Sequence, residues 1–350
     1  MIEKIRNRII EPSCTLINAL KVMDEQKVKI LFVFEKEKFI GMLTIGDIQR
    51  AIIKGSVLTS CVENIIDNDK VFGHVTDSSQ KIKDEMYRLR AECMPILNEN
   101  GDIVDVLFWT DVFLNTKHPP RELIDLPVVI MAGGKGTRMR PLTNVIPKPL
   151  LPIGEKTIIE RIMDQFEGIG CHKFYLSVNY KYEIIKFYLG SLSHNYDITF
   201  FQERKPMGTI GSVSLLNGKI TTPFFVSNCD TLIDQDFRDV YDYHVKNNND
   251  ITIITTVKSL RIPYGVIETG DNGLLKAISE KPENAYMINT GVYIMQPDLI
   301  NRIPENEHLD ITDLIKDVMN SDGKVGCFPV SERSWTDIGD WDQYLKRIRA

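Results

Sequence analysis

The sequence contains no apolar run that could span a membrane, because no stretch approaches 18 uncharged apolar residues. The N-terminal stretch MIEKIRNRII carries charges throughout, so we expect no signal peptide. Long basic runs are missing as well, and the net charge is −6 at pH 7. These absences argue against a membrane protein and against an electrostatic nucleic-acid binder.

Closely spaced cysteines are also missing, and with them the C-x-x-C pattern of a zinc site or a redox motif. The six cysteines are spread along the chain, at Cys14, Cys61, Cys93, Cys171, Cys229 and Cys327. In a chain of 350 residues this spacing favours buried, reduced thiols in a cytoplasmic protein over a disulfide framework or a structural zinc.

The length and an ordinary composition, 43% hydrophobic and 26% charged, indicate about two globular domains. Residues 114–127, LNTKHPPRELIDLP, contain two consecutive prolines that stop any helix, and they show no apolar periodicity. We therefore predict a first domain over residues 1–115, a linker over 116–126 and a second domain over 127–350.

The first domain repeats itself. Residues 15–52 and 79–113 each predict a β-α-β-β-α unit, and aligning Asp47 with Asp111 places the two copies 64 residues apart. One such unit buries too little apolar surface to be stable alone, so we expect the two copies to pack together.

The first copy contains GMLTIGD, ending at Asp47, which resembles the glycine–hydrophobic–hydrophobic–Thr–x–x–Asp signature of CBS domains. The resemblance implies a tandem CBS pair that binds an adenine nucleotide, with Thr44 near the phosphate and Asp47 on the ribose. In the second copy, DVLFWTD, Asp111 is kept and joins Thr44 and Asp47 as an implied regulatory-nucleotide residue. Asp105 replaces the glycine there and Phe108 the threonine, so the pattern supports one site rather than two. The alternative is a packing or dimerisation module in which Asp47 only caps its helix.

The second domain alternates apolar strands with helical patterns, which is typical of an α/β fold with a mixed, mostly parallel sheet and sites at strand carboxyl ends. We predict strands over residues 127–132, 174–178, 198–202, 223–228, 251–257, 264–268, 292–296 and 325–329. We predict helices over 157–168, 181–190, 209–217, 236–247 and 310–319, the first opened by a capping box of Thr157 and Glu160.

The most specific stretch, VVIMAGGKGTRMRPLTNVIPKPLLPI at residues 128–153, joins a strand to a glycine-rich turn. It is not a Rossmann fingerprint, because Met139 stands where the last glycine belongs, nor a Walker A loop, because Gly136 follows the lysine. Arg138 can bind phosphate bidentately, and Lys148, stiffened by a proline on each side, supplies a second cation. The alternative is a tight turn with surface cations.

The whole string closely resembles the signature of sugar-1-phosphate nucleotidyltransferases, and the resemblance extends over residues 127–345. It implies a Rossmann-like, GT-A-like domain with Arg138, Lys148 and Lys281 as catalytic cations. The implied nucleotide-binding residues are Met131, Ala132, Gly133, Gly134, Gly136, Thr137, Gln202 and Gly208. VSNCDTL and SWTDIGDWDQY supply the implied metal ligands, Asp230 and Asp337. PYGVIE, ISEKP and INTGVYIM supply the implied sugar-binding residues, Tyr264, Gly265, Glu280, Asn289 and Thr290.

The chemistry of that family explains these residue types. A sugar 1-phosphate and a nucleoside triphosphate are both anions, so bringing them together costs several kcal/mol unless cations intervene. Mg²⁺ on Asp230 and Asp337 would screen this repulsion, and no general base is needed because the nucleophile is already charged.

The Asn-x-Asp pattern of SNCD favours GTP, as in mannose- and heptose-1-phosphate guanylyltransferases of bacterial surface-sugar pathways. UTP, dTTP and CTP are the alternatives. The candidate sugars are mannose 1-phosphate, a heptose phosphate and glucosamine or N-acetylglucosamine 1-phosphate. A non-catalytic nucleotide sensor built on the CBS pair, and a glycosyltransferase of similar fold, are the rival hypotheses. We expect a homo-oligomer with no nucleic-acid or membrane partner.

Overall fold

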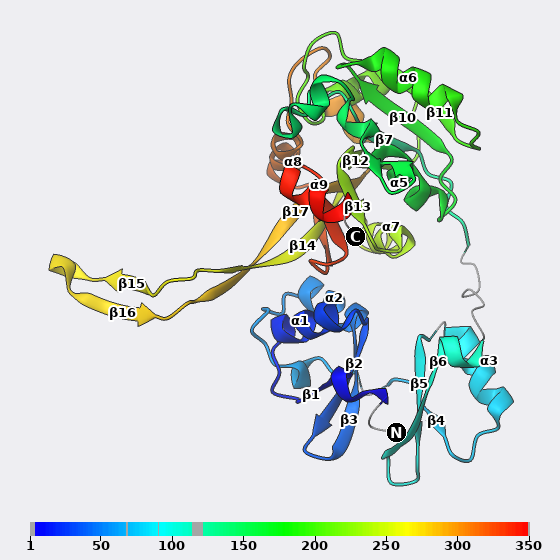
Figure 1. Cartoon of the computed structure of the whole chain (residues 1–350), viewed down its shortest axis with the longest axis vertical. Coiled ribbons are helices and arrows are strands. Elements are labelled where there is room, and N and C mark those ends of the chain that lie inside the picture. Colours follow the sequence, from blue (N-terminus) through cyan, green and yellow to red (C-terminus); the bar gives the residue numbers. More distant parts are fainter. Residues whose placement is uncertain (1–3, 68, 90, 114–121, 349–350) are drawn as a thin grey trace. The chain divides into compact units, whose positions relative to one another are not determined.

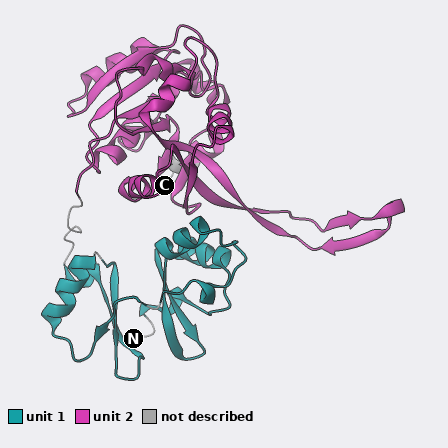
Figure 2. Ribbon diagram, turned by 180° about the vertical axis from the view of Figure 1, so that it is seen from behind, with its two compact units in different colours: residues 1–121 teal, residues 122–350 magenta. Residues whose placement is uncertain are grey.

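The computed structural model describes residues 4–67, 69–89, 91–113 and 122–348. It contains two compact units, residues 1–121 and 122–350 (Figure 2). The predicted linker, 116–126, lies mostly outside the described residues, so its bounds stay a prediction. None of the described helices is long and apolar enough to cross a membrane.

The first unit contains two copies of one arrangement of elements. In each copy a short strand pairs parallel with a longer one, which pairs antiparallel with a third. The first copy consists of η2 (Arg6–Arg8), β1 (Ile9–Ile10), α1 (Leu16–Gln26), β2 (Ile30–Glu35), β3 (Lys38–Thr44), α2 (Ile45–Ile53) and η3 (Val62–Asn64). The second consists of β4 (Gly73–His74), α3 (Ser79–Leu89), β5 (Cys93–Leu97), β6 (Ile103–Phe108) and α4 (Trp109–Val112). The predicted β-α-β-β-α repeat is therefore confirmed.

The two sheets of the first unit share one apolar core. Phe32 and Phe34 on β2 pack in the same cluster as Cys93 on β5 and Val106 on β6. Neither copy closes this core alone, as expected from the small apolar surface of one unit.

A seven-stranded sheet in the order β11-β10-β7-β12-β17-β14-β18 forms the centre of the second unit (Figure 1). Its strands are β7 (Val128–Met131), β10 (Lys173–Val178), β11 (Asp197–Gln202), β12 (Phe224–Asn228), β14 (Ile251–Arg261), β17 (Glu283–Met295) and β18 (Val325–Val330). Strand β17 is antiparallel to both of its neighbours, and the other pairs are parallel. The carboxyl ends of β7, β10, β11, β12 and β14 therefore meet at one edge of the sheet, the position where α/β folds bind their ligands.

Helices and short elements connect these strands. The α-helices are α5 (Ile158–Glu167), α6 (Tyr182–Ser191), α7 (Phe237–Lys246), α8 (Ile311–Asn320) and α9 (Trp341–Ile348). The 3-10 helices are η4 (Thr137–Met139), η5 (Leu142–Asn144), η6 (Lys148–Leu150), η7 (Gly211–Leu216), η8 (Asp271–Gly273) and η9 (Pro297–Arg302). Two small sheets pair β8 (Pro152–Ile153) with β9 (Lys156–Thr157), and β13 (Thr231–Ile233) with β19 (Trp335–Asp337).

One helix prediction based on local sequence is confirmed, and another is wrong. The predicted capping box of Thr157 and Glu160 opens α5. The helix predicted over residues 209–217 is instead the 3-10 helix η7. The amides of Ile210 and Gly211, at the start of this helix, both donate to the carbonyl of Leu309, so a distant segment satisfies the unpaired donors of the helix start.

Strands β14 and β17 continue beyond the sheet as a two-stranded arm, residues 258–288, which projects from the body of the unit (Figures 1 and 2). Pairing is uninterrupted from Thr255–Asn289 to Arg261–Glu283 and resumes between β15 (Val266–Thr269) and β16 (Leu275–Ser279) at the tip. The strands predicted over 251–257 and 292–296 are therefore too short. The predictions stopped where the apolar character of each strand declines, whereas the arm mixes polar and apolar residues and leaves most of its side chains exposed.

Candidate active site

Residues 132–136, the glycine loop, connect β7 to η4 at the carboxyl edge of the sheet. The backbone of Gly136 is left-handed, with φ 60°. A Cβ at this position would lie 3.0 Å from Thr143 Cγ2 and 3.2 Å from Lys148 Cβ, so glycine allows the segment around Lys148 to approach. A Cβ at Gly134 would meet no heavy atom within 4 Å, which leaves the loop open toward a ligand.

A buried cation and two carboxylates lie beside this loop. Lys148 on η6 is buried and forms an ion pair with Asp230, which follows β12. The pairing of β13 with β19 places Asp337 next to Asp230, and the amide of Ile338 donates to the Asp230 carbonyl at 2.8 Å. Residues from three separate stretches of the sequence therefore form one cluster.

Arg138 on η4 belongs to the same cluster and lies close to Asp337. A Cβ at Gly339 would lie 3.0 Å from Arg138 Nη2 and 2.8 Å from Asp337 Oδ1. Glycine at this position thus allows the guanidinium and the carboxylate to come close together. The charge cluster consists of Arg138, Lys148, Asp230 and Asp337.

The cluster places two like charges together. Burial raises the pKa of Asp337, the negative charge of Asp230 raises it further, and Lys148 and Arg138 act in the opposite direction. Adding another cation would therefore stabilise the ionised pair. Burial, and to a smaller extent the negative charge of Asp230, raise the pKa of the neighbouring Cys229 thiol to about 12. The thiol is therefore protonated at neutral pH and is no thiolate nucleophile.

Asp230 and Asp337 fit a magnesium ion better than a resident transition metal. Among the described residues, no three histidine, cysteine or acidic side chains lie together in the way that would hold a transition metal. Mg²⁺ is usually held by one or two carboxylates, with waters and substrate phosphates as its other ligands. The two carboxylates therefore match an ion that arrives with a triphosphate.

Glu203, which was not among the residues predicted from the sequence, lies directly behind the glycine loop, next to Gly133. Its side chain is buried and accepts hydrogen bonds from Ser177 Oγ at 2.6 Å and from the Met207 amide at 3.3 Å. A Cβ on Gly133 would lie 2.9 Å from Glu203 Oε1. In the sequence, Glu203 is marked only by directly following Gln202, one of the predicted nucleotide-binding residues.

The other predicted nucleotide residues lie along the same sheet edge. Gln202 is exposed at the end of β11, and Gly208, with φ 78°, packs against the backbone of Leu309. The remaining three are Met131, half-buried, Ala132, buried, and Thr137, exposed on η4.

The predicted sugar-binding residues fall into two groups. Asn289 and Thr290 lie at the base of the arm. Asn289 Nδ2 donates to the Tyr293 hydroxyl at 2.7 Å, and the hydroxyl of Thr290, which is buried, donates to the Ile254 carbonyl at 2.7 Å. The side-chain amide of Asn289 and the hydroxyl of Thr290 therefore both donate to partners within the sheet.

The second group lies on the arm. The amide of Lys281 donates to the Tyr264 carbonyl at 3.2 Å, and Gly265 faces the Glu280 carboxylate. Within the described residues, no hydrogen bond or ion pair joins this group to Asp230. A single copy of the chain therefore does not bring these residues to the charge cluster.

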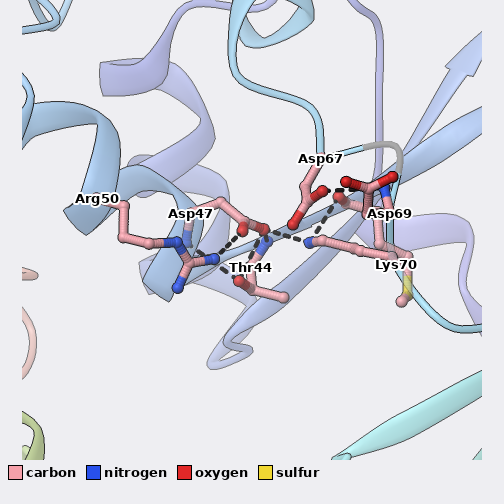
Figure 3. A network of polar contacts seen from close by, with 7 residues as sticks. Thr44, Asp47, Arg50, Asp67, Asp69 and Lys70 are labelled. Atoms are coloured by element: carbon pink, nitrogen blue, oxygen red, sulfur yellow. Dashed lines mark hydrogen bonds and ion pairs between the residues drawn. The ribbon is translucent and has the colours of Figure 1, made fainter.

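A separate polar network surrounds Asp47 in the first unit (Figure 3). Asp47 and Thr44 form a capping box at the start of α2, in which the Asp47 carboxylate accepts from the Thr44 amide at 2.7 Å. Arg50 and Lys70 both form ion pairs with the same carboxylate, and Lys70 Nζ also donates to the Met42 carbonyl at 3.0 Å.

This network keeps Asp47 ionised. Burial alone would raise its pKa, but the hydrogen bonds and charge of Lys70, together with those from Thr44, leave the pKa below its ordinary value. In the second copy, Asp111 is exposed in the first turn of α4, and Phe108 at the N-cap offers no side-chain hydrogen bond. The replacement of threonine by Phe108 thus removes the capping box from one copy.

Comparison with known proteins gives two family matches. The family described as "Nucleotidyl transferase" matches residues 127–350, and the family described as "CBS domain" matches residues 5–54. A mannose-1-phosphate guanyltransferase of Aspergillus oryzae is 32% identical over 229 residues, and that of Schizosaccharomyces pombe is 33% identical over 229 residues. Each alignment covers 63% of this chain and 62% of the relative, so the chain spans less than two thirds of these relatives.

A solved structure also matches about two thirds of the chain. HddC from Yersinia pseudotuberculosis, in a crystal structure with GMP-PN, is 25% identical with a TM-score of 0.50. The match covers 64% of this chain and 98% of HddC.

Proposed function

Because the chain belongs to the nucleotidyl transferase family, we propose that its second unit transfers a nucleoside monophosphate from a nucleoside triphosphate to a sugar 1-phosphate. The observation that carries the proposal is the convergence of Arg138, Lys148, Asp230 and Asp337 beside the glycine loop. A phosphoryl-transfer site needs cations on the transferred group and little covalent chemistry from the protein, and this cluster has that composition.

In this reaction a phosphate oxygen of the sugar 1-phosphate attacks the α-phosphorus of the triphosphate. The bond between the α-phosphorus and the oxygen bridging to the β-phosphate breaks, and pyrophosphate leaves with the electron pair. Mg²⁺ held by Asp230 and Asp337 would supply positive charge for both phosphates. Lys148 and Arg138 offset charge on the leaving pyrophosphate, and the open backbone at Gly134 lets the triphosphate approach the loop.

GTP is the favoured donor. The relatives from the two fungi are named mannose-1-phosphate guanyltransferases, and HddC was crystallised with a guanine nucleotide analogue. Together with the SNCD sequence ending at Asp230, these names support a guanylyltransferase. We take mannose 1-phosphate as the first sugar to test, followed by heptose and glucosamine 1-phosphates.

The test is pyrophosphate release from each triphosphate with Mg²⁺ and a panel of sugar 1-phosphates. We expect release with GTP and at least one sugar phosphate, and turnover at least about a hundredfold lower in Arg138→Ala. Absence of pyrophosphate with every combination would contradict the proposal, and near wild-type turnover in Arg138→Ala would contradict the role of that residue.

The first unit is proposed to bind a regulatory adenine nucleotide at Thr44 and Asp47. Because Lys70 forms an ion pair with the Asp47 carboxylate, a ribose hydroxyl that binds this carboxylate would have to displace Lys70. Titration calorimetry with AMP, ADP and ATP tests this, with Asp47→Ala as the control that loses binding. No heat with any of the three nucleotides would favour a packing module instead.

A further inference from the structure

Beyond its base, where the Lys258 ammonium lies 5.8 Å from the centre of the Trp335 ring, the arm, residues 258–288, is largely exposed. Strands β15 and β16 pair only with each other, and the arm exposes large apolar side chains, among them Tyr264 (74% exposed), Leu274 (72%) and Ile278 (64%). A two-stranded ribbon is marginally stable in water by itself, and exposed apolar patches mark contact surfaces. The arm therefore requires a covering surface.

The arm also carries a cation that the charge cluster lacks. In the cluster, Lys148 is paired with Asp230, and Arg138 lies beside Asp337. On the arm, Lys281 is half-exposed, and its nearest carboxylate, Glu280, is 3.9 Å away. If the proposed function holds, the dianionic sugar phosphate would need a protein cation beside the shared Mg²⁺, and Lys281 is the cation that the arm offers.

The arm's own geometry prevents it from turning back onto its own copy. Eight residues separate Lys281 from Asn289 at the sheet edge, which is roughly 26 Å of extended strand. The ladder between Thr255–Asn289 and Arg261–Glu283 is unbroken, and neither strand has a glycine in this region. A turn back toward Asp230 would break these backbone hydrogen bonds.

The arm leaves the sheet from the same edge that holds the charge cluster. Strands β12 and β14 both run antiparallel to β17, so they end at the same edge, β12 before Asp230 and β14 in the arm. Two copies that face each other at this edge about a two-fold axis would each lay an arm across the other's cluster.

We propose that two copies of this chain exchange arms, so that Lys281 and Glu280 of one copy complete the sugar-phosphate site beside Asp230 and Asp337 of the other. The exchange covers the exposed apolar face of each arm and supplies the missing cation in the same contact. This proposal rests on the proposed function only for the role of Lys281, because the exchange itself is a property of the fold.

Complementation between two inactive variants tests the exchange. Lys281→Met and Asp337→Asn chains with different tags are co-expressed, and the mixed particle is purified through both tags. With exchanged arms, one of its two sites has an intact body and an intact arm, so we expect about half of the wild-type turnover. Each parent alone should have less than about a hundredth, as for other lost charge stabilisers. A purified mixed particle as inactive as its parents would show that each arm serves its own copy and would overturn the proposal.

A second measurement needs no catalysis, so it separates failure of the exchange from failure of the proposed function. Isotope-labelled and unlabelled chains are mixed, allowed to exchange subunits and coupled with a zero-length carbodiimide. We expect linked peptides that join Lys276 or Lys281 to acidic residues of the body with one label from each chain. Links with the same label only, or a monomeric chain in solution, would overturn the exchange even if wild-type turnover is normal.

Discussion

Replacing Lys148 with alanine should tighten the binding of Mg²⁺ to the free protein while it slows turnover. The side chains of Lys148 and Asp230 are only 8% and 17% exposed, and their ion pair occupies a carboxylate that the metal needs. Lys148 also counteracts the raised pKa of Asp337. Without it, the repulsion between the two carboxylates is no longer offset by the lysine, and a divalent cation would offset it instead.

The magnitude follows from Coulomb's law. Two unit charges about 4 Å apart attract by about 4 kcal/mol at an effective dielectric constant of about 20. Rehydration of the freed carboxylate offsets part of this, so we expect a net gain of about 1–3 kcal/mol, or a Kd for Mg²⁺ lowered about 5- to 150-fold. Turnover should fall about a hundredfold, because the lysine no longer offsets charge on the leaving pyrophosphate.

Titration calorimetry with Mg²⁺ in the absence of nucleotide measures the first effect, and pyrophosphate release measures the second. The matched control is Lys156→Ala, which removes an exposed lysine paired with Asp164 at 2.7 Å and should change neither quantity. Unchanged or weaker Mg²⁺ binding in Lys148→Ala would refute the view that the lysine and the metal compete for Asp230.

Three further predictions concern single positions. Gly339→Ala places a Cβ close to both Arg138 and Asp337. We expect turnover to drop about 10- to 100-fold with an unchanged melting temperature, because catalytic groups tolerate little displacement. Wild-type turnover in this variant would contradict the close packing at Gly339. Lys70→Met leaves the buried Asp47 with Arg50 as its remaining ion-pair partner, and calorimetric unfolding should show the first unit destabilised by about 2–3 kcal/mol. A Lys70→Met protein with wild-type stability would argue against this pair. Because the pKa of Asp47 is lowered, its stabilisation is complete above the ordinary aspartate pKa of about 3.9 and is lost as the pH falls through the lower folded-state pKa. The melting-temperature difference between wild type and Asp47→Asn should therefore be constant from about pH 7 to 5 and shrink below about pH 4, and a difference that grows on acidification would contradict the lowered pKa.

Local patterns determined much of the fold. The duplicated unit of the first domain, the capping box of α5 and the parallel strands of the second unit all follow from periodicity and end signals that lie within a few residues of each other. The same holds for the glycine loop, where the left-handed Gly136 is visible as a glycine in a turn.

Other features depend on segments far apart in the chain. Residues 209–217 have a helical pattern, but residues 211–216 form a 3-10 helix whose first amide donates to the distant Leu309 carbonyl. Glu203 and Lys70 were missed because their partners, the glycine loop and Asp47, lie at a distance in the sequence. A pattern along one segment cannot show which distant groups satisfy its buried charges.

The sequence by itself determined the family of the second unit and the residue types on which the proposed chemistry rests: those for a triphosphate, a divalent cation and a sugar phosphate, in the order in which they occur. Only the tertiary structure decided which of them meet. The pairing of β13 with β19 brings Asp337 to Asp230, whereas the unbroken ladder of β14 and β17 carries Lys281 away from both. The physical reason is that strand pairing is fixed by long-range hydrogen bonding, which the local sequence pattern does not encode.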